Sequence, residues 1–228
     1  MRPKDPLRSK ETLTTIQNLV DDGINRMCVI MRHSDRHFHP EAAMEPFMGL
    51  TEAGKDYAMD LGAGLPEAPR PIFFSSPFGR CIETACIMDK GYIRAHGRFN
   101  GHNTLATELS PFYIRDMNQA FVLLSETGSP VFLRRWFNGQ IPTSAMADPR
   151  ETADIIAGFM VRQLENLSDS QIALCVSHDW NIYPLKEFKL GLKHENTGSV
   201  GFLESLVVFE HNGKPFLTGF QTEPQPLT

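Results

Sequence analysis

The sequence has little cysteine, no long apolar run and no excess of positive charge. Its four cysteines form no Cys-x-x-Cys pair, and Cys28 and Cys175 lie inside apolar stretches. This pattern favours buried, reduced thiols over disulfides, as is typical of a cytoplasmic protein. The net charge of −5 argues against general nucleic-acid binding, which needs a broad basic surface.

Membrane-targeting features are also lacking. No stretch approaches the roughly 18 consecutive apolar residues that a spanning helix requires. The polar segment Met1–Lys10 contains two prolines and resembles neither a signal peptide nor an anchor. We therefore expect no membrane partner and a cytoplasmic location.

The overall composition is that of an ordinary globular protein, with 41% hydrophobic and 21% charged residues. A chain of 228 residues is long enough to bury a substantial core. We expect one domain over residues 1–228, with an insertion or cap over residues 91–149, where the regular pattern loosens towards Pro149.

Short apolar runs alternate with amphipathic segments along the chain. Three runs are typical of buried strands: Met27–Met31, Pro71–Ser75 and Ile172–Val176. Helices are predicted over Glu11–Asp21, from the N-cap Thr51 to Leu61, and over Phe78–Lys90, Asp116–Ser125, Val131–Phe137, Glu151–Leu167 and 179–190. Residues 91–102 predict a loop, Ser205–Glu210 and Pro215–Phe220 a hairpin, and the chain from Thr222 a frayed tail. The alternation predicts an α/β fold: a three-layer α/β/α sandwich with a mostly parallel sheet and a small helical insertion near the active site.

Each predicted strand ends in side chains suited to binding an anion. They are Arg32, His33 and Arg36 after the first strand, Arg80 in the helix turn after the second, and His178 and Asp179 after the third. Because the carboxyl ends of parallel strands meet at one edge of a sheet, we expect these side chains to converge on one site.

The chemistry of these residue types points to phosphoryl transfer. Three arginines can hold the non-bridging oxygens of a phosphoryl group. His33 can attack phosphorus, and a nearby carboxylic acid can protonate the leaving oxygen. A metal site at His33, His37 and His39 is the alternative, but the adjacent arginines would repel a cation.

The same segments resemble the histidine phosphatase superfamily, which includes phosphoglycerate mutases and histidine acid phosphatases. The segment Arg32-His33-Ser34-Asp35-Arg36 is similar to the family's Arg-His-Gly-x-Arg signature, with Ser34 in place of the usual small Gly or Ala. Further similar segments are Leu50-Thr51-x-x-Gly54, Ser75-Ser76-Pro77-x-x-Arg80 and Ser177-His178-Asp179, so that the resemblance spans residues 27–192. It implies that His33 is the nucleophile and that Arg32, Arg36, Arg80 and His178 bind the phosphoryl group.

The resemblance leaves two candidates for the proton donor. In the acid phosphatase branch the donor is the Asp after the second histidine, which Asp179 matches. In the mutase-like branch it is a Glu between the third arginine and the second histidine, for which Glu108 is the counterpart. We favour Asp179, because its neighbour His178 ties it to the site.

The sequence thus predicts a metal-independent phosphomonoesterase that works through a phosphohistidine and needs no cofactor. Its expected partner is a small phosphorylated substrate or inorganic phosphate. Two alternatives stay open: a phosphomutase of the same superfamily, and a catalytically weak protein that binds a phosphorylated ligand.

Overall fold

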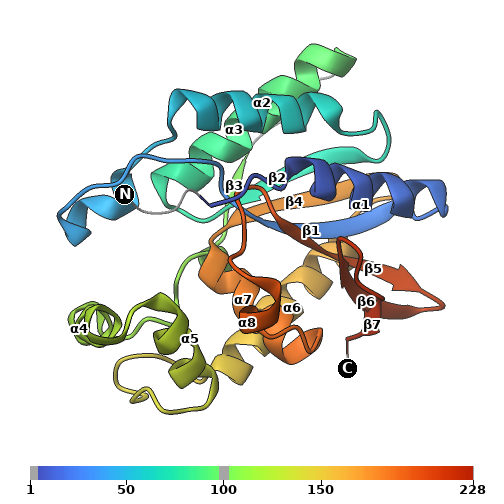
Figure 1. Ribbon diagram of the computed structural model, residues 1–228. Helices are drawn as coiled ribbons and strands as arrows, with labels where there is room; N and C mark the ends of the chain where they lie inside the picture. Colours follow the sequence, from blue (N-terminus) through green and yellow to red (C-terminus); the bar gives the residue numbers. More distant parts are fainter. Residues whose placement is uncertain (1–4, 98–102, 228) are drawn as a thin grey trace.

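A single mixed sheet forms the middle layer of the molecule. The computed structural model describes residues 5–97 and 103–227, and its strands follow the order β3-β2-β4-β1-β5-β6-β7 (Figure 1). Their bounds are β1 Arg26–Arg32, β2 Arg70–Ser75, β3 Thr104–Leu105, β4 Gln171–Ser177, β5 Ser205–His211, β6 Lys214–Gly219 and β7 Gln225–Pro226. Strands β1 to β4 pair in parallel, whereas β5, β6 and β7 add to the sheet antiparallel.

Helices cover both faces of the sheet, as the alternating pattern predicts (Figure 1). One face carries α1 Ser9–Asp21, α2 Glu52–Gly64 and α3 Gly79–His96. The other carries α6 Pro149–Asn166 and α7 Asp179–Lys189, with α4 Met117–Thr127, α5 Ser129–Phe137 and α8 His194–Thr197. Two short 3-10 turns, η1 Ala42–Phe47 and η2 Thr107–Leu109, lie in the connections. This is the three-layer α/β/α arrangement.

Strand β1 is buried on both faces, which explains why its sequence is continuously apolar rather than alternating. Cys28 and Ile30 enter the core beneath α6 and α7, while Met27, Val29 and Met31 enter the core beneath α1 to α3. Each of these five side chains is fully buried. The strand is therefore fixed by packing from above and below, and its last residue is fixed with it.

Helix α3 corrects the prediction of a loop over residues 91–102. The helix continues to His96, and Gly97 then ends it with a positive φ of 66°. Gly91 lies inside the helix, where a Cβ would approach the Met59 carbonyl oxygen to 2.2 Å. That glycine allows α2 and α3 to pack closely and does not break the helix. The remainder of the predicted loop, residues 98–102, lies outside the described residues.

The carboxyl-terminal tail is also more ordered than predicted. The predicted hairpin is confirmed, with Asn212 and Gly213 at positive φ in its turn. The chain beyond Thr222 was expected to fray, but β7 pairs with β6 and the Leu227 amide donates to the Pro215 carbonyl. The sequence did not predict β7, because a strand of two residues is too short to show a hydrophobic pattern.

The other predicted helices are also present, although each differs from its predicted range at one end or at both. Thr51 caps α2 by accepting a hydrogen bond from the Gly54 amide at 3.0 Å. Three of the four cysteines are buried free thiols, whereas Cys86 is exposed. Among the described residues, no helix combines the length and apolar character needed to cross a membrane.

An ion-pair network joins α5 to the helices at the end of the chain. Arg134 binds the carboxylates of Glu187, at 2.8 Å, and Glu195, at 2.6 Å. The guanidinium lowers the pKa of Glu195 to about 2. Whether residues 91–149 form an insertion within one domain stays a prediction.

Candidate active site

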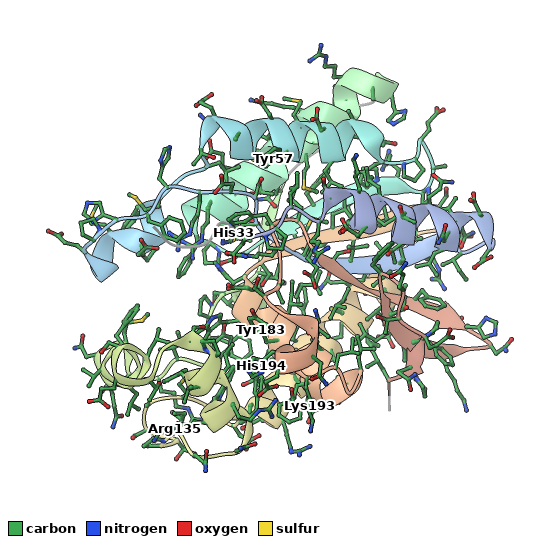
Figure 2. All side chains as sticks on the ribbon, viewed as in Figure 1. His33, Tyr57, Arg135, Tyr183, Lys193 and His194 are labelled. Carbon is green, nitrogen blue, oxygen red and sulfur yellow. The ribbon has the colours of Figure 1, made fainter. Side chains whose placement is uncertain are left out.

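His33 lies at the end of β1, between the two helical layers (Figure 2). Its backbone amide donates to the Ser177 carbonyl at 2.9 Å, so the β1–β4 pairing continues to this residue. The ring atom Nδ1 lies 2.7 Å from the Ser34 carbonyl oxygen. A carbonyl can only accept, so Nδ1 carries the proton and Nε2 keeps its lone pair. The backbone thereby selects the tautomer that a nucleophilic imidazole needs.

The imidazole of His33 is also held neutral. Burial lowers its pKa well below the ordinary value of 6.5, and the nearby charges of Arg80 and Arg32 lower it further. A neutral ring has the lone pair that attack on phosphorus requires. His33 is therefore ready to react at neutral pH without first losing a proton.

His178 follows β4, and its ring centroid lies 5.6 Å from that of His33. Its Nδ1 is 3.2 Å from Arg80 Nη2, which can only donate, so Nδ1 accepts and the ring proton is on Nε2. That Nε2 lies 3.0 Å from the Ser76 hydroxyl. Burial and then the charge of Arg80 lower the pKa of His178 well below its ordinary value. The adjacent Cys81 thiol is no rival nucleophile, because burial raises its pKa to about 12.

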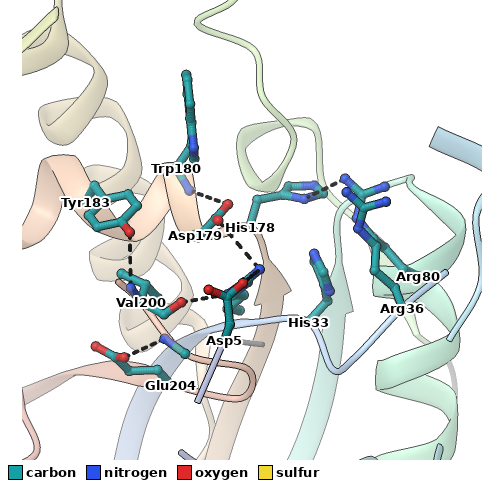
Figure 3. Close-up of polar contacts among 12 residues, drawn as sticks. Asp5, His33, Arg36, Arg80, His178, Asp179, Trp180, Tyr183, Val200 and Glu204 are labelled. Carbon is teal, nitrogen blue, oxygen red and sulfur yellow. Dashed lines mark hydrogen bonds and ion pairs between the residues drawn. The ribbon is translucent and has the colours of Figure 1, made fainter. Parts of the chain in front are cut away.

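Arg80 lies in the first turn of α3 and reaches His178 (Figure 3). Besides His178, it donates from Nη1 to the Glu45 carbonyl at 2.8 Å. Burial and the charge of Arg36 lower its pKa to about 10, so it remains a cation at neutral pH. Its Nε is buried and has no hydrogen-bond partner among the described residues.

Arg32 is the most firmly held of the three arginines. Its Nη1 donates to the Val200 carbonyl at 2.6 Å, and its Nη2 lies 2.9 Å from Asp5 and 3.6 Å from Asp179. Burial by itself would lower its pKa, but Asp179 and Asp5 outweigh that effect and the pKa is raised. Its Nε, like that of Arg80, is buried without a partner among the described residues.

Arg36 lies beyond the end of β1, and Figure 3 shows its guanidinium beside that of Arg80. Its Nη1 is paired with the carboxylate of Glu45, a residue of η1. The other Glu45 carboxylate oxygen accepts the His39 amide at 2.7 Å. Glu45 therefore holds two of the arginines, Arg36 through its carboxylate and Arg80 through its carbonyl.

No family model and no curated protein matches the sequence, but solved structures resemble the fold. A phosphoglycerate mutase from Bacillus anthracis is similar at a TM-score of 0.57 and 17% identity, over 87% of this chain and 94% of that one. A phosphoserine phosphatase from Entamoeba histolytica, in complex with phosphoserine, gives 0.53 and 16%, over 85% and 95%. A mycobacterial glucosyl-3-phosphoglycerate phosphatase with inorganic phosphate gives 0.53 and 15%, over 89% and 96%.

The chain has the histidine phosphatase fold. At 15–17% identity this likeness concerns the fold alone. The predicted superfamily resemblance agrees with it.

Within the histidine phosphatase fold, the two candidate proton donors lie in different settings. Asp179 is the first residue of α7, 31% exposed, with one oxygen accepting the Trp180 amide and the other facing Arg32. Glu108 lies in η2, and its carboxylate faces Arg162 at 3.5 Å, outside this cluster of contacts. The structure joins Asp179 to Arg32 and does not join Glu108 to any of the three arginines.

Several residues of the site have no counterpart in the sequence prediction. They are Asp5 and Val200 at Arg32, Glu45 at Arg36 and Arg80, and Ser76 at His178. Only Ser76 could have been suspected from the sequence, because it lies in the Ser75-Ser76-Pro77 segment that resembles the superfamily. Asp5 and Val200 lie in irregular segments and Glu45 lies in the short turn η1, where no repeating sequence pattern marks a site residue.

His33, His37 and His39, the alternative metal site, do not lie close enough together in the described structure to share an ion. In the described parts of the chain, the one group of carboxylates and imidazoles close enough to share an ion is Glu187, His194 and Glu195. Arg134 is already paired with both of those carboxylates. His37 is exposed and His39 half-buried, in the loop that follows Arg36.

Proposed function

We propose that this protein is a phosphomonoesterase that forms a phosphohistidine at His33. The observation that carries the proposal is the hydrogen bond between His33 Nδ1 and the Ser34 carbonyl, which leaves Nε2 as a neutral nucleophile among arginines. The fold likeness to phosphatases supports it. Arg32 and Arg80 each have a buried Nε–H that no described residue satisfies, and these donors suit an anionic oxygen.

The reaction proceeds in two displacements at phosphorus. In the first, His33 Nε2 forms the bond to phosphorus while the ester P–O bond breaks and Asp179 gives its proton to the leaving oxygen. In the second, the Asp179 carboxylate takes a proton from water, whose oxygen attacks phosphorus and breaks the P–N bond. Inorganic phosphate leaves, and His33 and Asp179 return to their starting states.

Arg32, Arg36, Arg80 and His178 bind the phosphoryl oxygens during both displacements. Donors fixed before the reaction stabilise the charge that develops on these oxygens. Arg80 and His178 are held to each other, and Arg32 is held by Val200 and Asp5, so these groups need little rearrangement.

The test is hydrolysis of p-nitrophenyl phosphate and of an alkyl phosphate, with EDTA present, across pH 4 to 8. We expect His33→Ala to abolish hydrolysis of both esters. Asp179→Asn should impair the alkyl ester more than the nitrophenyl ester, since nitrophenolate leaves without needing a proton. Glu108→Gln should affect the two esters equally and weakly.

Other outcomes would redirect the assignment. Selective loss of alkyl-ester hydrolysis in Glu108→Gln would make Glu108 the proton donor. Phosphate binding without turnover by the wild type would favour a protein that binds a phosphorylated ligand. Activity that EDTA removes would contradict the metal-independent mechanism.

A further inference from the structure

Carboxyl groups already face two of the three arginines of the candidate site. Asp5 and Asp179 both face Arg32, at 2.9 and 3.6 Å. The Glu45 carboxylate is paired with Arg36. The carboxylates of Asp5 and Glu45 thus offset two of the three arginine charges, Asp179 carries the proton that it gives to the leaving oxygen, and His33 and His178 are neutral. The binding of one phosphoryl group therefore makes the site negative overall.

Phenyl rings also lie beside the guanidinium groups. Each of the three arginines lies over one ring: Arg32 over Phe202 at 4.3 Å, Arg36 over Phe38 at 4.0 Å and Arg80 over Phe78 at 4.9 Å. Phe38 is 52% exposed, so one wall beside Arg36 is an accessible apolar surface. A ring offers no hydrogen-bond donor from its face to a second anionic group.

The cations on neighbouring elements are also paired. Arg162 on α6 faces Glu108 at 3.5 Å, and Lys186 on α7 binds Glu204 at 2.8 Å. These two cations beside the site thus have carboxylate partners, and Arg80, which has none among the described residues, is engaged with His178 and the Glu45 carbonyl. A second anion on a substrate would meet carboxylates and phenyl rings.

We propose that the site selects phosphomonoesters whose leaving group carries no negative charge, and that Glu45 and Asp5 determine this selectivity. The proposal rests on the phosphatase function proposed above and names its substrate class. Glu45 and Asp5 act by repelling a second anion, because like charges several ångströms apart in a partly desolvated site repel each other strongly. Phosphorylated carboxylic acids are consequently poor substrates, and phosphates of neutral alcohols are good ones.

The first test compares benzyl phosphate with 4-carboxybenzyl phosphate at pH 7 and low ionic strength. The two esters have nearly the same reacting bond and shape and differ in one distant carboxylate. We expect kcat/KM to be about tenfold higher for benzyl phosphate, and the ratio to shrink as salt is added. Equal kcat/KM values, with both activities abolished by His33→Ala, would contradict the selectivity but leave the phosphatase function standing.

The second test assigns the selectivity to its residues. Glu45→Gln keeps an oxygen for the Arg36 and His39 contacts and removes the charge, and Asp5→Asn does the same at Arg32. Each is expected to reduce the tenfold ratio to about threefold. Glu210→Gln, an exposed site at the far end of β5, changes the net charge equally and serves as the control, with the ratio unchanged.

Each outcome of the second test decides the proposal. A ratio unchanged in both Glu45→Gln and Asp5→Asn would overturn the role of these carboxylates, and an equal fall in Glu210→Gln would show a general charge effect instead. Absence of His33-dependent hydrolysis of either ester by the wild type would overturn both this inference and the proposed function.

Discussion

The two halves of the candidate site are built in different ways. His33 and His178 follow adjacent parallel strands, whose register pairs Arg32 with Ser177. Asp5 comes instead from an irregular segment and Glu45 from the short turn η1, and both are held by polar contacts to arginines. The strand-end half is positioned by the packed sheet, whereas the loop half is positioned by charge. We expect substitutions in the strand-end half to alter the rate of phosphoryl transfer and substitutions in the loop half to alter the choice of substrate.

After loss of the nucleophile itself, the largest effect should come from Arg80→Leu, which removes the cation between the two halves. Arg80 contacts His178 on one side and the Glu45 carbonyl on the other. Loss of this donor to the transition state should lower kcat/KM for p-nitrophenyl phosphate about 10³-fold. Arg162→Leu, on α6, is the matched control. A loss below tenfold, in protein with a native circular dichroism spectrum, would show that Arg80 does not bind the phosphoryl group in the transition state.

The second prediction concerns the pH dependence of stability in the strand-end half. Burial lowers the pKa of both His33 and His178 below 6.5, so the unfolded chain binds protons that the native chain does not. Stability should therefore fall as pH drops from 7 to 5, by at most about 1.4 kcal/mol per pH unit for each histidine.

Urea denaturation at pH 7 and pH 5 measures this slope. His33→Gln removes one of the two groups and should flatten it, while His211→Gln, at an exposed position in β5, serves as the control. If His33→Gln keeps the full wild-type slope, His33 is not held neutral by the fold.

The third prediction tests how the η2 loop is attached to the strand-end half. Asn181 is buried and donates to the carbonyls of Glu108 and Ser110, and it accepts from the Tyr113 hydroxyl at 3.1 Å. Asn181→Ala should lower the free energy of unfolding by about 2 kcal/mol, because several buried polar groups lose their partner. Tyr113→Phe removes one of these bonds and should cost about 1 kcal/mol in the same urea titration. Equal losses in the two variants would mean that the carbonyl contacts contribute nothing.

The smallest effect is expected at Ser34, the residue that departs from the family signature. Its hydroxyl donates to the Gly54 carbonyl at 2.7 Å, which ties the loop after β1 to the start of α2. Ser34→Ala should lower the free energy of unfolding by about 1 kcal/mol. Thr14→Ala, an exposed hydroxyl on α1, provides the comparison in thermal or urea unfolding. A more stable Ser34→Ala variant would show that this hydrogen bond is not favourable.

The same division explains what could be predicted from the sequence. Arg32, His33 and His178 follow apolar runs whose length marks buried strands, so local pattern was enough to bring them together. Glu45 could not be found this way, because its role depends on a loop that folds back onto Arg36 nine positions earlier. Asp5 reaches Arg32 only because the Phe202 amide and carbonyl hold the chain on either side of Leu7.

Element ends were missed for a related reason. Gly91 reads as a helix breaker when only its neighbours are considered, but it is the contact point of α3 with the Met59 carbonyl in α2. The two-residue strand β7 has no periodicity of its own and exists because β6 offers it partners. In both cases the deciding interaction is with another element and cannot be read from the segment itself.

The short outer strands also bear on how one copy of this protein meets another. At the two sides of the described sheet lie β3 and β7, each two residues long, and one of them contains Pro226, which has no amide hydrogen to donate. A long unpaired edge is a template for strand addition by a second chain and a starting point for aggregation. Each of these outermost strands offers an incoming strand a ladder of only two residues, which disfavours strand addition at β3 and β7.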